Sequence, residues 1–407
     1  MLSFLTEPDG EKLENCSSDR RQIIPMHKGL TLYSPLLRMK TGELNGIVNL
    51  RNIIKDFIRP HFIIPPSAER ENLNFDLFDQ LEGQSNAGQL LAPFWRGRSA
   101  FLNPRYIYKE FGEEKATDWL PKLYESARSG SVDAIPVASL RDLESPRFDG
   151  LLNSIDRSRE LQFMVSLKAD DLLDTNLKSR LDKQLSRLKI SSGNCSIQVD
   201  FQGSYFEEPD GVAEIIEGAY EDIQAFGTWE SIVFQGTSFP EVNPAQHGSV
   251  EIVPRNEWIA WSKAISLSSA TPENFVFGDY AADSAKMHFG AGSAAAIRHY
   301  RYTTPESWLV SRGAETGKDK ARMQWVATQI LNSGQFAGRD FSQADEYIHN
   351  TANGSGGPGN STTWRQINTT HHLTRVVHDI ALARGIIIDV PADQKEHAKQ
   401  LEFLQDL

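Results

Sequence analysis

The sequence predicts an α/β fold: a single (β/α)8, TIM-barrel-like domain with short extensions at both ends. Two observations predict it. Short apolar runs rich in β-branched and aromatic residues recur along the chain, and most are followed by a segment with helical spacing. Strands that are apolar almost throughout and separated by helices are typical of a parallel sheet buried on both faces. A doubly wound open sheet is the alternative, but no G-x-G-x-x-G motif opens a helix after any run.

The predicted strands lie between residues 30 and 313. They are the runs at 32–37, 59–66, 133–140, 161–168, 195–202, 230–236, 274–280, 297–303 and 307–313. The last two are close enough in sequence to form a hairpin in place of one regular strand–helix unit. We expect one domain at 29–390, a polar N-terminal extension at 1–28 and a C-terminal tail at 391–407, because nothing inside the domain resembles a linker.

Apolar residues at helical spacing predict helices between and after these strands. One stripe consists of Leu173, Leu177, Leu181, Leu185 and Leu188. The same spacing recurs at Trp258 and Trp261, and at Met323, Val326, Ala327, Ile330 and Leu331. Asn368 or Thr369 is expected to cap a last helix that ends before Gly385 and buries Leu373, Val376, Val377 and Ile380. We interpret these apolar side chains as core packing.

Composition excludes several classes of protein. The 407 residues carry 42 basic and 54 acidic side chains, and the resulting charge of −12 argues against a basic surface for duplex DNA or anionic lipid. The two cysteines, Cys16 and Cys195, are too few for a disulfide framework or a cysteine-based zinc site, and we expect Cys195 to be a small core residue. With no secretory signal and no apolar run of eighteen residues, a cytoplasmic protein without a membrane span is expected.

Polar side chains gather at the carboxyl ends of the predicted strands, where ligands of parallel barrels and sheets bind. They are Lys40, Glu43, Lys168, Asp170, Asp200, Gln202, Gln235, Asp279, Tyr280, Arg301, Tyr302 and Arg312. Any one of them could be a solvated charge or a structural ion pair. Taken together, they predict a polar and partly cationic mouth.

An arginine cradle for phosphate or carboxylate is the first candidate site. Arg301, Arg312 and Arg365 could supply planar, bidentate guanidinium groups. Asp200 and Asp279 would orient these groups or hold a hard cation, and Mg²⁺ remains a cofactor candidate because it needs only one or two carboxylates. The sequence does not choose between these roles.

The segment from 354 to 372 supplies further candidates. GSGGPGN at 354–360 could present backbone N–H groups to an anion, or could be a flexible connector. His371 and His372 are candidate general bases that helical geometry turns in different directions, and the alternative is a capping or buried, hydrogen-bonded histidine. Neither a zinc-binding H-E-x-x-H motif nor a G-x-S-x-G nucleophile elbow occurs.

Several segments of the chain resemble the beta protein family of phages, phage satellites and bacterial genomes. The resemblance is strongest from 248 to 377, in GSVEIVPRNEWIAW, FVFGDYAA, AIRHYRYTTPESWLVSRG, GRDFSQADEYI and GGPGNSTTWRQINTTHHLTRVV. The N-terminal YSPLLRMKTGEL and IRPHFIIPP also match the opening of the family. Recurrent polar positions of the family fall on Lys40, Glu43, Arg255, Asp279, Tyr280, Arg301, Tyr302, Arg312, Asp345, Asn360, Thr362, Trp364, Arg365, His371 and His372.

The resemblance implies a link to antiphage defence, in some members beside a toxin-like partner that they restrain, but no established reaction. Two functional hypotheses follow. In the first, the barrel mouth binds, and in an enzymatic version hydrolyses, a phosphorylated ligand, nucleotide or nucleic-acid end, with Asp279, Arg301, Arg312 and His372 as the working set. In the second, the protein is a non-catalytic immunity or interaction protein that regulates a toxin or defence protein from a neighbouring gene.

Overall fold

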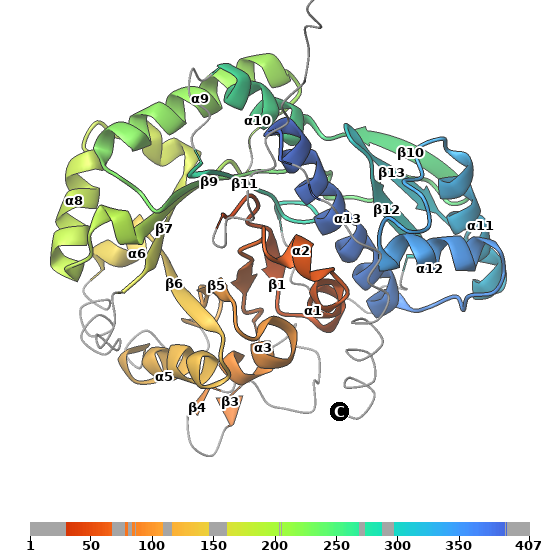
Figure 1. The fold of residues 1–407 in the computed structure, drawn as a ribbon, viewed down its shortest axis with the longest axis horizontal. Coiled ribbons are helices and arrows are strands. Elements are labelled where there is room, and N and C mark those ends of the chain that lie inside the picture. Colours follow the sequence, from red (N-terminus) through yellow and green to blue (C-terminus); the bar gives the residue numbers. More distant parts are fainter. Residues whose placement is uncertain are drawn as a thin grey trace, which may run out of the picture.

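A nearly complete ring of parallel strands forms the centre of the molecule (Figure 1). The computed structural model describes residues 30–66, 78–79, 84–85, 87–108, 116–145, 161–202, 204, 206–267, 273–286, 297–386 and 388, so the expected extensions at 1–28 and 391–407 lie outside it. In sheet order, the strands are β1 (Leu36–Arg38), β2 (His61–Ile63), β5 (Ser99–Asn103), β6 (Asp133–Ser139), β7 (Phe163–Lys168), β8 (Cys195–Asp200), β9 (Ser231–Gln235) and β11 (Phe275–Gly278).

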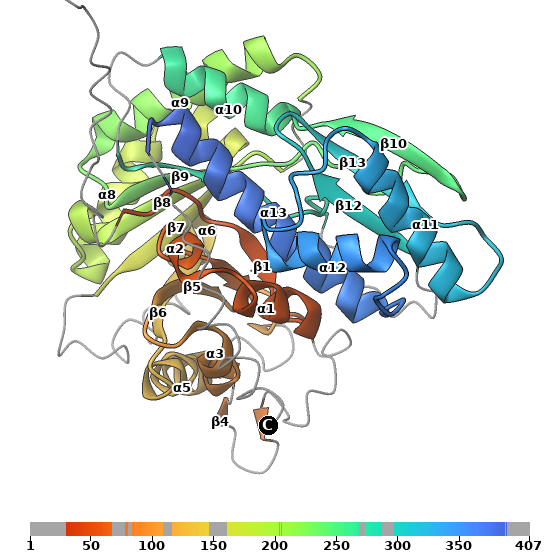
Figure 2. The same ribbon diagram turned by 45° about the vertical axis from the view of Figure 1, so that its right-hand side comes forward.

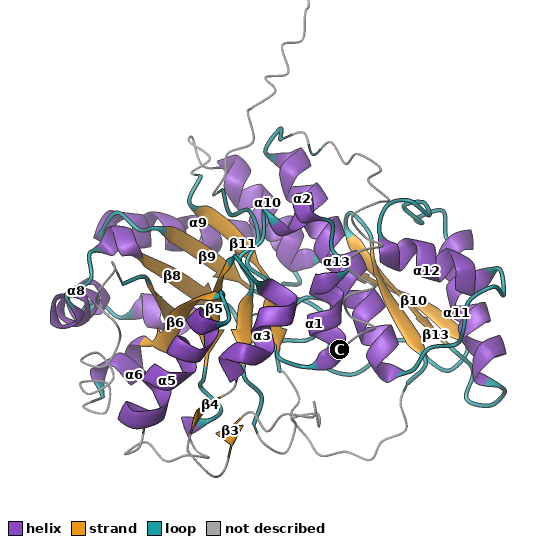
Figure 3. Cartoon of the chain, turned by 60° about the horizontal axis from the view of Figure 1, so that its bottom comes forward, coloured by secondary structure: helices purple, strands orange, loops and turns teal. Residues whose placement is uncertain are grey.

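The first and last strands of this sheet meet. The backbone N–H of Ser34 donates to the carbonyl of Phe277 at 2.8 Å, and that of Leu36 donates to the carbonyl of Asp279 at 2.8 Å. The fold is therefore mixed α/β, with a nearly closed, eight-stranded, parallel, barrel-like sheet, and Figure 3 shows helices around it. The part of the α/β prediction that concerns a parallel sheet covered by helices is confirmed.

Two apolar layers hold the barrel together. The layer inside the sheet consists of Phe101, Ile135, Val137, Met164, Val233 and Val276. The larger layer lies between the sheet and α1 (Thr41–Val48), α2 (Asn52–Lys55), α3 (Ala87–Trp95), α5 (Ala116–Ser129), α6 (Leu140–Glu144), α8 (Leu177–Leu188), α9 (Pro209–Phe226) and α10 (Asn256–Leu267). Cys195 is buried, and so are Trp258 and Trp261, as predicted. Among the helices described, none has the length and apolar character required to cross a bilayer.

The leucine stripe predicted for α8 is correct except at its start. Leu177, Leu181, Leu185 and Leu188 are buried, but Leu173 is 83 % exposed. Leu173 ends a separate 3₁₀ turn, and the carboxylate of the next residue, Asp174, accepts a hydrogen bond from the backbone N–H of Asn176 at 2.9 Å. Such an aspartate turn interrupts the helix, so the stripe begins one turn later.

A second, antiparallel sheet lies beside the barrel (Figure 2). It contains β10 (Ser249–Pro254), β13 (Ser307–Arg312) and β12 (His299–Thr303), covered by α11 (Asp319–Asn332) and α12 (Gln343–Ala352); we call these five elements the three-stranded lobe. The predicted hairpin is confirmed as β12 and β13, but its expected place in the barrel was wrong. Strand β5 of the barrel and strand β10 of the lobe were not predicted from the sequence. A separate two-stranded ribbon joins β3 (Phe78–Asp79) to β4 (Gln84–Ser85).

Helix α13 (Ser361–Ala383) connects the lobe with the barrel, lying against α1 and β12 (Figure 1). The predicted cap at Asn368 or Thr369 was wrong, because Asn360 caps the helix by accepting from the backbone N–H of Thr363 at 3.0 Å. The buried face of the last three turns is as predicted, and Gly385 follows the end with φ of 67°. Within the helix, Asn368 accepts from the backbone N–H of Arg301, so its polarity serves a tertiary contact.

Candidate functional site

Two glycines of α1 allow α13 to approach the carboxyl edge of the barrel. A Cβ atom on Gly42 would lie 2.8 Å from Cβ of Arg365, and one on Gly46 would lie 2.7 Å from Cβ of Thr369. Real Cβ atoms do not tolerate such distances, so the i, i+4 pair of glycines is what lets the two helices touch. This close contact places the start of α13, and therefore Arg365, beside the end of β1.

Three guanidinium groups converge on one carboxylate at this edge. Asp283 accepts hydrogen bonds from Arg38 on Oδ2 at 2.6 Å, from Arg365 on Oδ2 at 2.6 Å and from Arg301 on Oδ1 at 2.7 Å. The three arginines come from β1, α13 and β12, and Asp283 comes from the loop after β11. With Glu43 of α1, we call these five residues the arginine cluster. Its formal charge is +3 − 2 = +1.

Each guanidinium of the cluster also has an anchor other than Asp283. Glu43 accepts from the backbone N–H of Arg38 at 2.5 Å and from its Nε at 2.8 Å, and lies 3.8 Å from Arg365. Arg301 donates to the carbonyl of Ala282 at 2.6 Å, and its guanidinium lies 4.5 Å from the ring centroid of Phe239. The cluster is therefore held in place from several sides.

The arginine cluster is only partly open to solvent. The side chain of Arg365 is 33 % exposed and that of Asp283 is 18 % exposed, whereas those of Arg38 and Glu43 are buried. Burial opposes the ionisation of Asp283, but Arg365, Arg301 and Arg38 outweigh it and hold the pKa of this carboxyl well below its usual range. Beside the cluster, burial and Arg301 lower the pKa of His299 to about 3, which keeps that imidazole neutral.

A second polar pair lies at the same edge of the barrel. The hydroxyl of Tyr280 donates to Oδ1 of Asp200 at 2.6 Å, and the backbone N–H of Gln202 donates to the same oxygen at 2.9 Å. Burial raises the pKa of Asp200, with the hydrogen bond from Tyr280 and the charge of Arg105 acting in the opposite direction. The side chain of Gln202 donates to the carbonyl of Ala285 at 3.1 Å, so this pair and Asp283 are tied to one loop.

Below this edge, a neutral polar layer crosses the barrel interior. Nε2 of His61 lies 3.1 Å from the amide of Asn103, Nδ1 lies 3.3 Å from the amide of Gln198, and Gln198 bonds Gln235 at 3.1 Å. Burial lowers the pKa of His61 to about 3, so only one ring nitrogen carries a proton. Nε2 of Gln198 donates to Oε1 of Gln235, and the ring nitrogen of His61 that carries no proton accepts from the amide that faces it.

Asp279 and His372 do meet, away from the arginine cluster. Nε2 of His372 donates to Oδ2 of Asp279 at 2.9 Å, while Oδ1 accepts from the hydroxyl of Tyr33 at 2.5 Å. Nδ1 of His372 accepts from the hydroxyl of Thr303 at 2.8 Å. Burial lowers the pKa of His372, which fits a neutral imidazole with one donor and one acceptor. Both nitrogens are occupied, and the side chains of His372 and Asp279 are fully buried.

His371 faces the three-stranded lobe and His372 faces the barrel, so the two histidines point in different directions, as helical geometry predicts. Nδ1 lies 3.0 Å from the carboxylate of Asp345 and Nε2 lies 2.7 Å from the carbonyl of Thr303. Both partners are acceptors, so a ring nitrogen that carries a proton donates it to Asp345 or to the carbonyl of Thr303. The ring stacks on Tyr302 at a centroid distance of 3.8 Å, and the Tyr302 hydroxyl donates to Asp345 at 2.7 Å. These contacts join α12, α13 and β12.

A third buried charged group lies near Asp279. Arg255 donates to the carbonyl of Thr304 and to the carboxylate of Asp379, each at 2.7 Å, which links the start of α10 with α13 and the lobe. Glu257 accepts from the backbone N–H and hydroxyl of Ser238 at 3.0 and 2.7 Å. Burial raises the pKa of Glu257 to about 7, although the charge of Arg255 opposes the change.

The remaining candidates are distributed over both parts of the fold. Arg312 is not in the arginine cluster: it lies on the lobe, where it donates to the carbonyl of Ala245 at 2.9 Å. Lys40 directly precedes α1. Thr362 lies in the first turn of α13, behind its cap Asn360, and Trp364 donates to the carbonyl of Pro358 at 2.8 Å. Asp200, Asp279, Arg301, Arg312, Arg365 and His372 are thus divided among separate hydrogen-bonded groups.

The two residues that the sequence reading missed are Arg38 and Asp283. Arg38 ends β1 one position beyond the predicted strand at 32–37, and Asp283 lies four positions after Asp279, directly after the FVFGDYAA segment. The search for polar residues at the carboxyl ends of strands would have included Arg38 if the first strand had been predicted one residue longer. Among the described residues, no group of three or more His, Cys, Asp or Glu side chains could hold a metal ion.

Comparison with known protein families identifies the family of the chain. No curated protein matches the sequence. The family model for Beta protein matches residues 33–378, a range that covers most of the chain and contains all five residues of the arginine cluster. The chain therefore belongs to the Beta protein family.

Proposed function

We propose that the arginine cluster binds the phosphoryl group of a phosphorylated ligand, such as a nucleotide or a nucleic-acid end. The observation that carries this proposal is the convergence of Arg38, Arg301 and Arg365 from three elements on one carboxylate. Guanidinium groups are suited to phosphate because their donors form parallel hydrogen bonds to its oxygens. The cluster is locally cationic although the whole chain carries −12.

The position of the cluster supports the same proposal. We propose that the sheet is a TIM-barrel-like (β/α)8 barrel in a broad sense, with the three-stranded lobe inserted around β11. The ligands of such barrels bind at the carboxyl ends of the strands, where the loops converge. Arg38 ends β1, and Asp283 follows β11, so the cluster lies at the edge that this architecture uses for function.

Hydrolysis of the bound phosphorylated ligand is an extension of this proposal. Asp200 is a better placed general base for it than His372. His372 is fully buried and both of its nitrogens are engaged, whereas Oδ2 of Asp200 receives no hydrogen bond from the described residues. A raised pKa suits a general base that works near neutral pH. Release of inorganic phosphate from nucleotides, lost in Asp200→Asn while binding persists, would support hydrolysis.

The binding proposal predicts that Arg365→Ala loses affinity for phosphate. Arg365 is the most exposed of the three arginines, so its removal should disturb the fold least and remove one charge-assisted contact, which is worth about 1.5–3 kcal/mol. Isothermal titration with inorganic phosphate and with adenosine monophosphate measures the loss. Arg339→Ala, which removes an exposed arginine paired with Glu346, is the matched control. Equal affinities of the wild type, Arg365→Ala and Arg339→Ala would refute the proposal.

The link to antiphage defence remains a proposal and adds a cellular test. If ligand binding at the arginine cluster is what protects cells, Arg365→Ala should abolish protection at an unchanged protein level. Plaque counts on cells that express the wild type or the variant measure this directly. Full protection by Arg365→Ala would separate defence from the arginine cluster.

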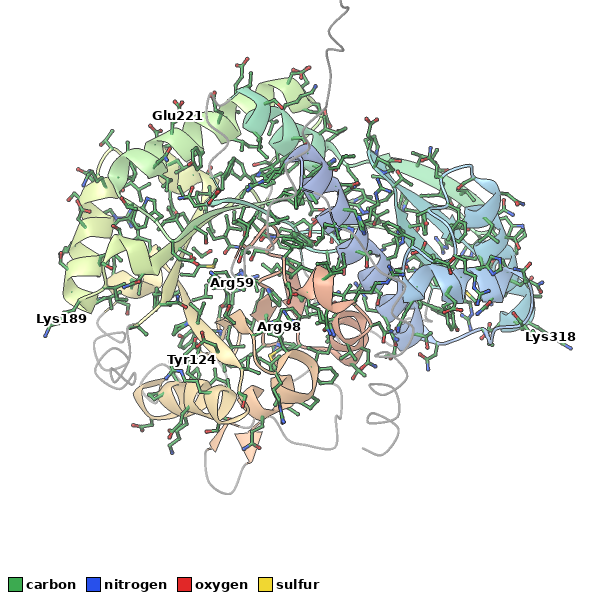
Figure 4. All side chains as sticks on the ribbon, in the orientation of Figure 1. Arg59, Arg98, Tyr124, Lys189, Glu221 and Lys318 are labelled. Carbon is green, nitrogen blue, oxygen red and sulfur yellow. The ribbon has the colours of Figure 1, made fainter. Side chains whose placement is uncertain are left out.

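A second candidate function is a non-catalytic regulator of a basic partner, such as a toxin or defence protein from a neighbouring gene. The observation in its favour is the sequence from 190 to 254, which contains eleven acidic residues and neither lysine nor arginine. Many of these acids are exposed on and before α9, as Glu221 is in Figure 4. Such a surface would attract a basic partner chiefly by electrostatic steering. Copurification of a neighbouring gene product that high salt releases would support this function.

A further inference from the structure

The carboxylate of Asp283 occupies the place that a bound anion would take between the three arginines, and it is not the only group that holds them there. Its two carboxylate oxygens receive the hydrogen bonds of Arg38, Arg301 and Arg365. Each of these arginines keeps another contact: Arg38 with Glu43, Arg301 with Ala282 and Phe239, and Arg365 with α1 at Gly42 and with Glu43. The guanidinium groups would therefore stay close together without Asp283.

We infer that Asp283 is a resident competitor that sets the ligand specificity of the arginine cluster, so that the cluster accepts dianionic phosphoryl groups and rejects monocarboxylates. This inference rests on the proposed function. A ligand must displace the carboxylate of Asp283 before it can take the same donors. A free monocarboxylate brings no more charge and no more oxygens than Asp283, whose effective concentration is on the order of millimolar or higher because it belongs to the same chain.

A phosphoryl group has two advantages over the resident carboxylate. It carries up to two negative charges, and without Asp283 the remaining four side chains of the cluster have a formal charge of +3 − 1 = +2. It also presents at least three oxygens, one for each guanidinium, whereas Arg38 and Arg365 share Oδ2 of Asp283. The exchange is therefore favourable for phosphate and unfavourable for acetate.

The exchange leaves Asp283 close to its starting position. Its own loop is tied to the barrel on both sides, by Thr237, which donates to the carbonyl of Asp283 at 3.3 Å, and by Gln202, which donates to the carbonyl of Ala285. Only the side chain needs to rotate away, and the rotation also breaks the hydrogen bond that Oδ1 accepts from the backbone N–H of Ser284 at 3.0 Å. The side chain is 18 % exposed, so one path for rotation leads to solvent.

Asp283→Asn tests the inference, with inorganic phosphate and acetate as the probes in isothermal titration. The neutral amide should compete less well, so the Kd for phosphate should fall about tenfold and acetate binding should become measurable. Asp182→Asn removes the same charge from an exposed pair with Lys178 on α8 and should change neither value. Urea unfolding of every variant reports whether the fold is intact.

The outcomes separate this inference from the proposed function. Phosphate binding that weakens in Asp283→Asn would make Asp283 an organiser of the arginines and overturn the inference, while the proposed function would stand. Absence of phosphate binding in both proteins would overturn both, whereas binding by the variant alone would support both. If Asp283→Asn unfolds, Asp283→Ser repeats the measurement; unfolding of both neutral variants would make the carboxylate a required structural ion and refute the inference.

Discussion

Glu257 is a buried carboxyl group whose protonation state is coupled to the stability of the fold. It lies beside Arg255 and Asp279, and Ser238 supplies two hydrogen bonds to one of its oxygens. Burial raises its pKa from 4.5 to about 7, because the surroundings disfavour the charged form. Between these two values, the unfolded chain releases the proton and the folded protein keeps it. The free energy of unfolding that Glu257 contributes is therefore complete below pH 4.5 and is lost as the pH rises to about 7.

We predict that Glu257→Gln removes this pH dependence. The difference in unfolding free energy between the variant and the wild type should grow with pH from 4.5 to 7, by about 3 kcal/mol in favour of the variant, and then stay constant. Urea unfolding at half-unit steps of pH measures the curve. Glu241→Gln, at an exposed pair with Lys286, is the control and should give no comparable slope. A difference that does not change with pH for Glu257→Gln would contradict the burial argument.

Single residues of the arginine cluster could be predicted where a local rule applied. Glu43, Arg301 and Arg365 were found from strand ends and motifs. The partner of Arg301 and Arg365 could not be found in the same way, because Asp283 comes from a loop and meets β1 and α13 only in three dimensions. The sequence reading grouped Arg312 with these arginines, but the lobe sheet carries it to Ala245 instead.

The contact between α1 and α13 depends on the absence of two side chains. Gly46→Ala would place a methyl group 2.7 Å from Cβ of Thr369. The helices must then separate, and we predict that the free energy of unfolding falls by about 1–3 kcal/mol, as is usual for overpacking. Urea unfolding measures the change. Gly42→Ala should in addition weaken phosphate binding, because Arg365 is the residue that it would displace.

Gly218→Ala is the matched control for this prediction. Gly218 lies inside α9, and a Cβ atom there would meet no atom within 4 Å. The same substitution should stabilise the protein by about 0.5–1 kcal/mol, because alanine has the better helix propensity. Stabilisation by Gly46→Ala would show that α1 and α13 are not in the close contact described above.

Whole elements could be predicted where the spacing of apolar residues was regular. The prediction failed where polar residues form hydrogen bonds to residues far away in the sequence. The buried stripes of α8 and α13 follow from the spacing of leucine, valine and isoleucine. The predicted start of α13 lay two turns too late, because Asn368 and Thr369 are residue types that often cap helices. In the structure, Asn368 accepts from the backbone N–H of Arg301, and the neighbouring Thr370 donates to the carbonyl of Gly46. Strand β5 was missed because only Ala100, Phe101 and Leu102 form its apolar run.

At the scale of the whole molecule, the fold class could be predicted, but the division into barrel and lobe could not. Nothing in the runs at 297–303 and 307–313 distinguishes a barrel strand from a strand of a separate sheet. Their placement depends on α13, which buries Asp279 with His372 on the barrel side and Asp345 with His371 on the lobe side. One helix thus fixes both parts through two adjacent histidines.

The uneven distribution of charge over the molecule leads to a test that separates the two proposed functions. The tract at 190–254 contributes −11 of the net −12, and the remaining 43 acidic and 42 basic residues nearly balance. Neutralising three exposed acids of α9 in Glu214→Gln, Glu221→Gln and Asp222→Asn would change the net charge from −12 to −9 without altering the arginine cluster.

If the proposed role in defence through ligand binding at the arginine cluster holds, we expect this triple variant to retain the protection given by the wild type and Arg365→Ala to lose it. Plaque counts compare the two at matched expression, and titration with phosphate confirms that the triple variant still binds. The reverse result, with protection lost in the triple variant and kept in Arg365→Ala, would assign the biological role to the acidic surface. An acidic surface acts through a basic partner, so the partner should then fail to copurify with the triple variant and copurify normally with Arg365→Ala.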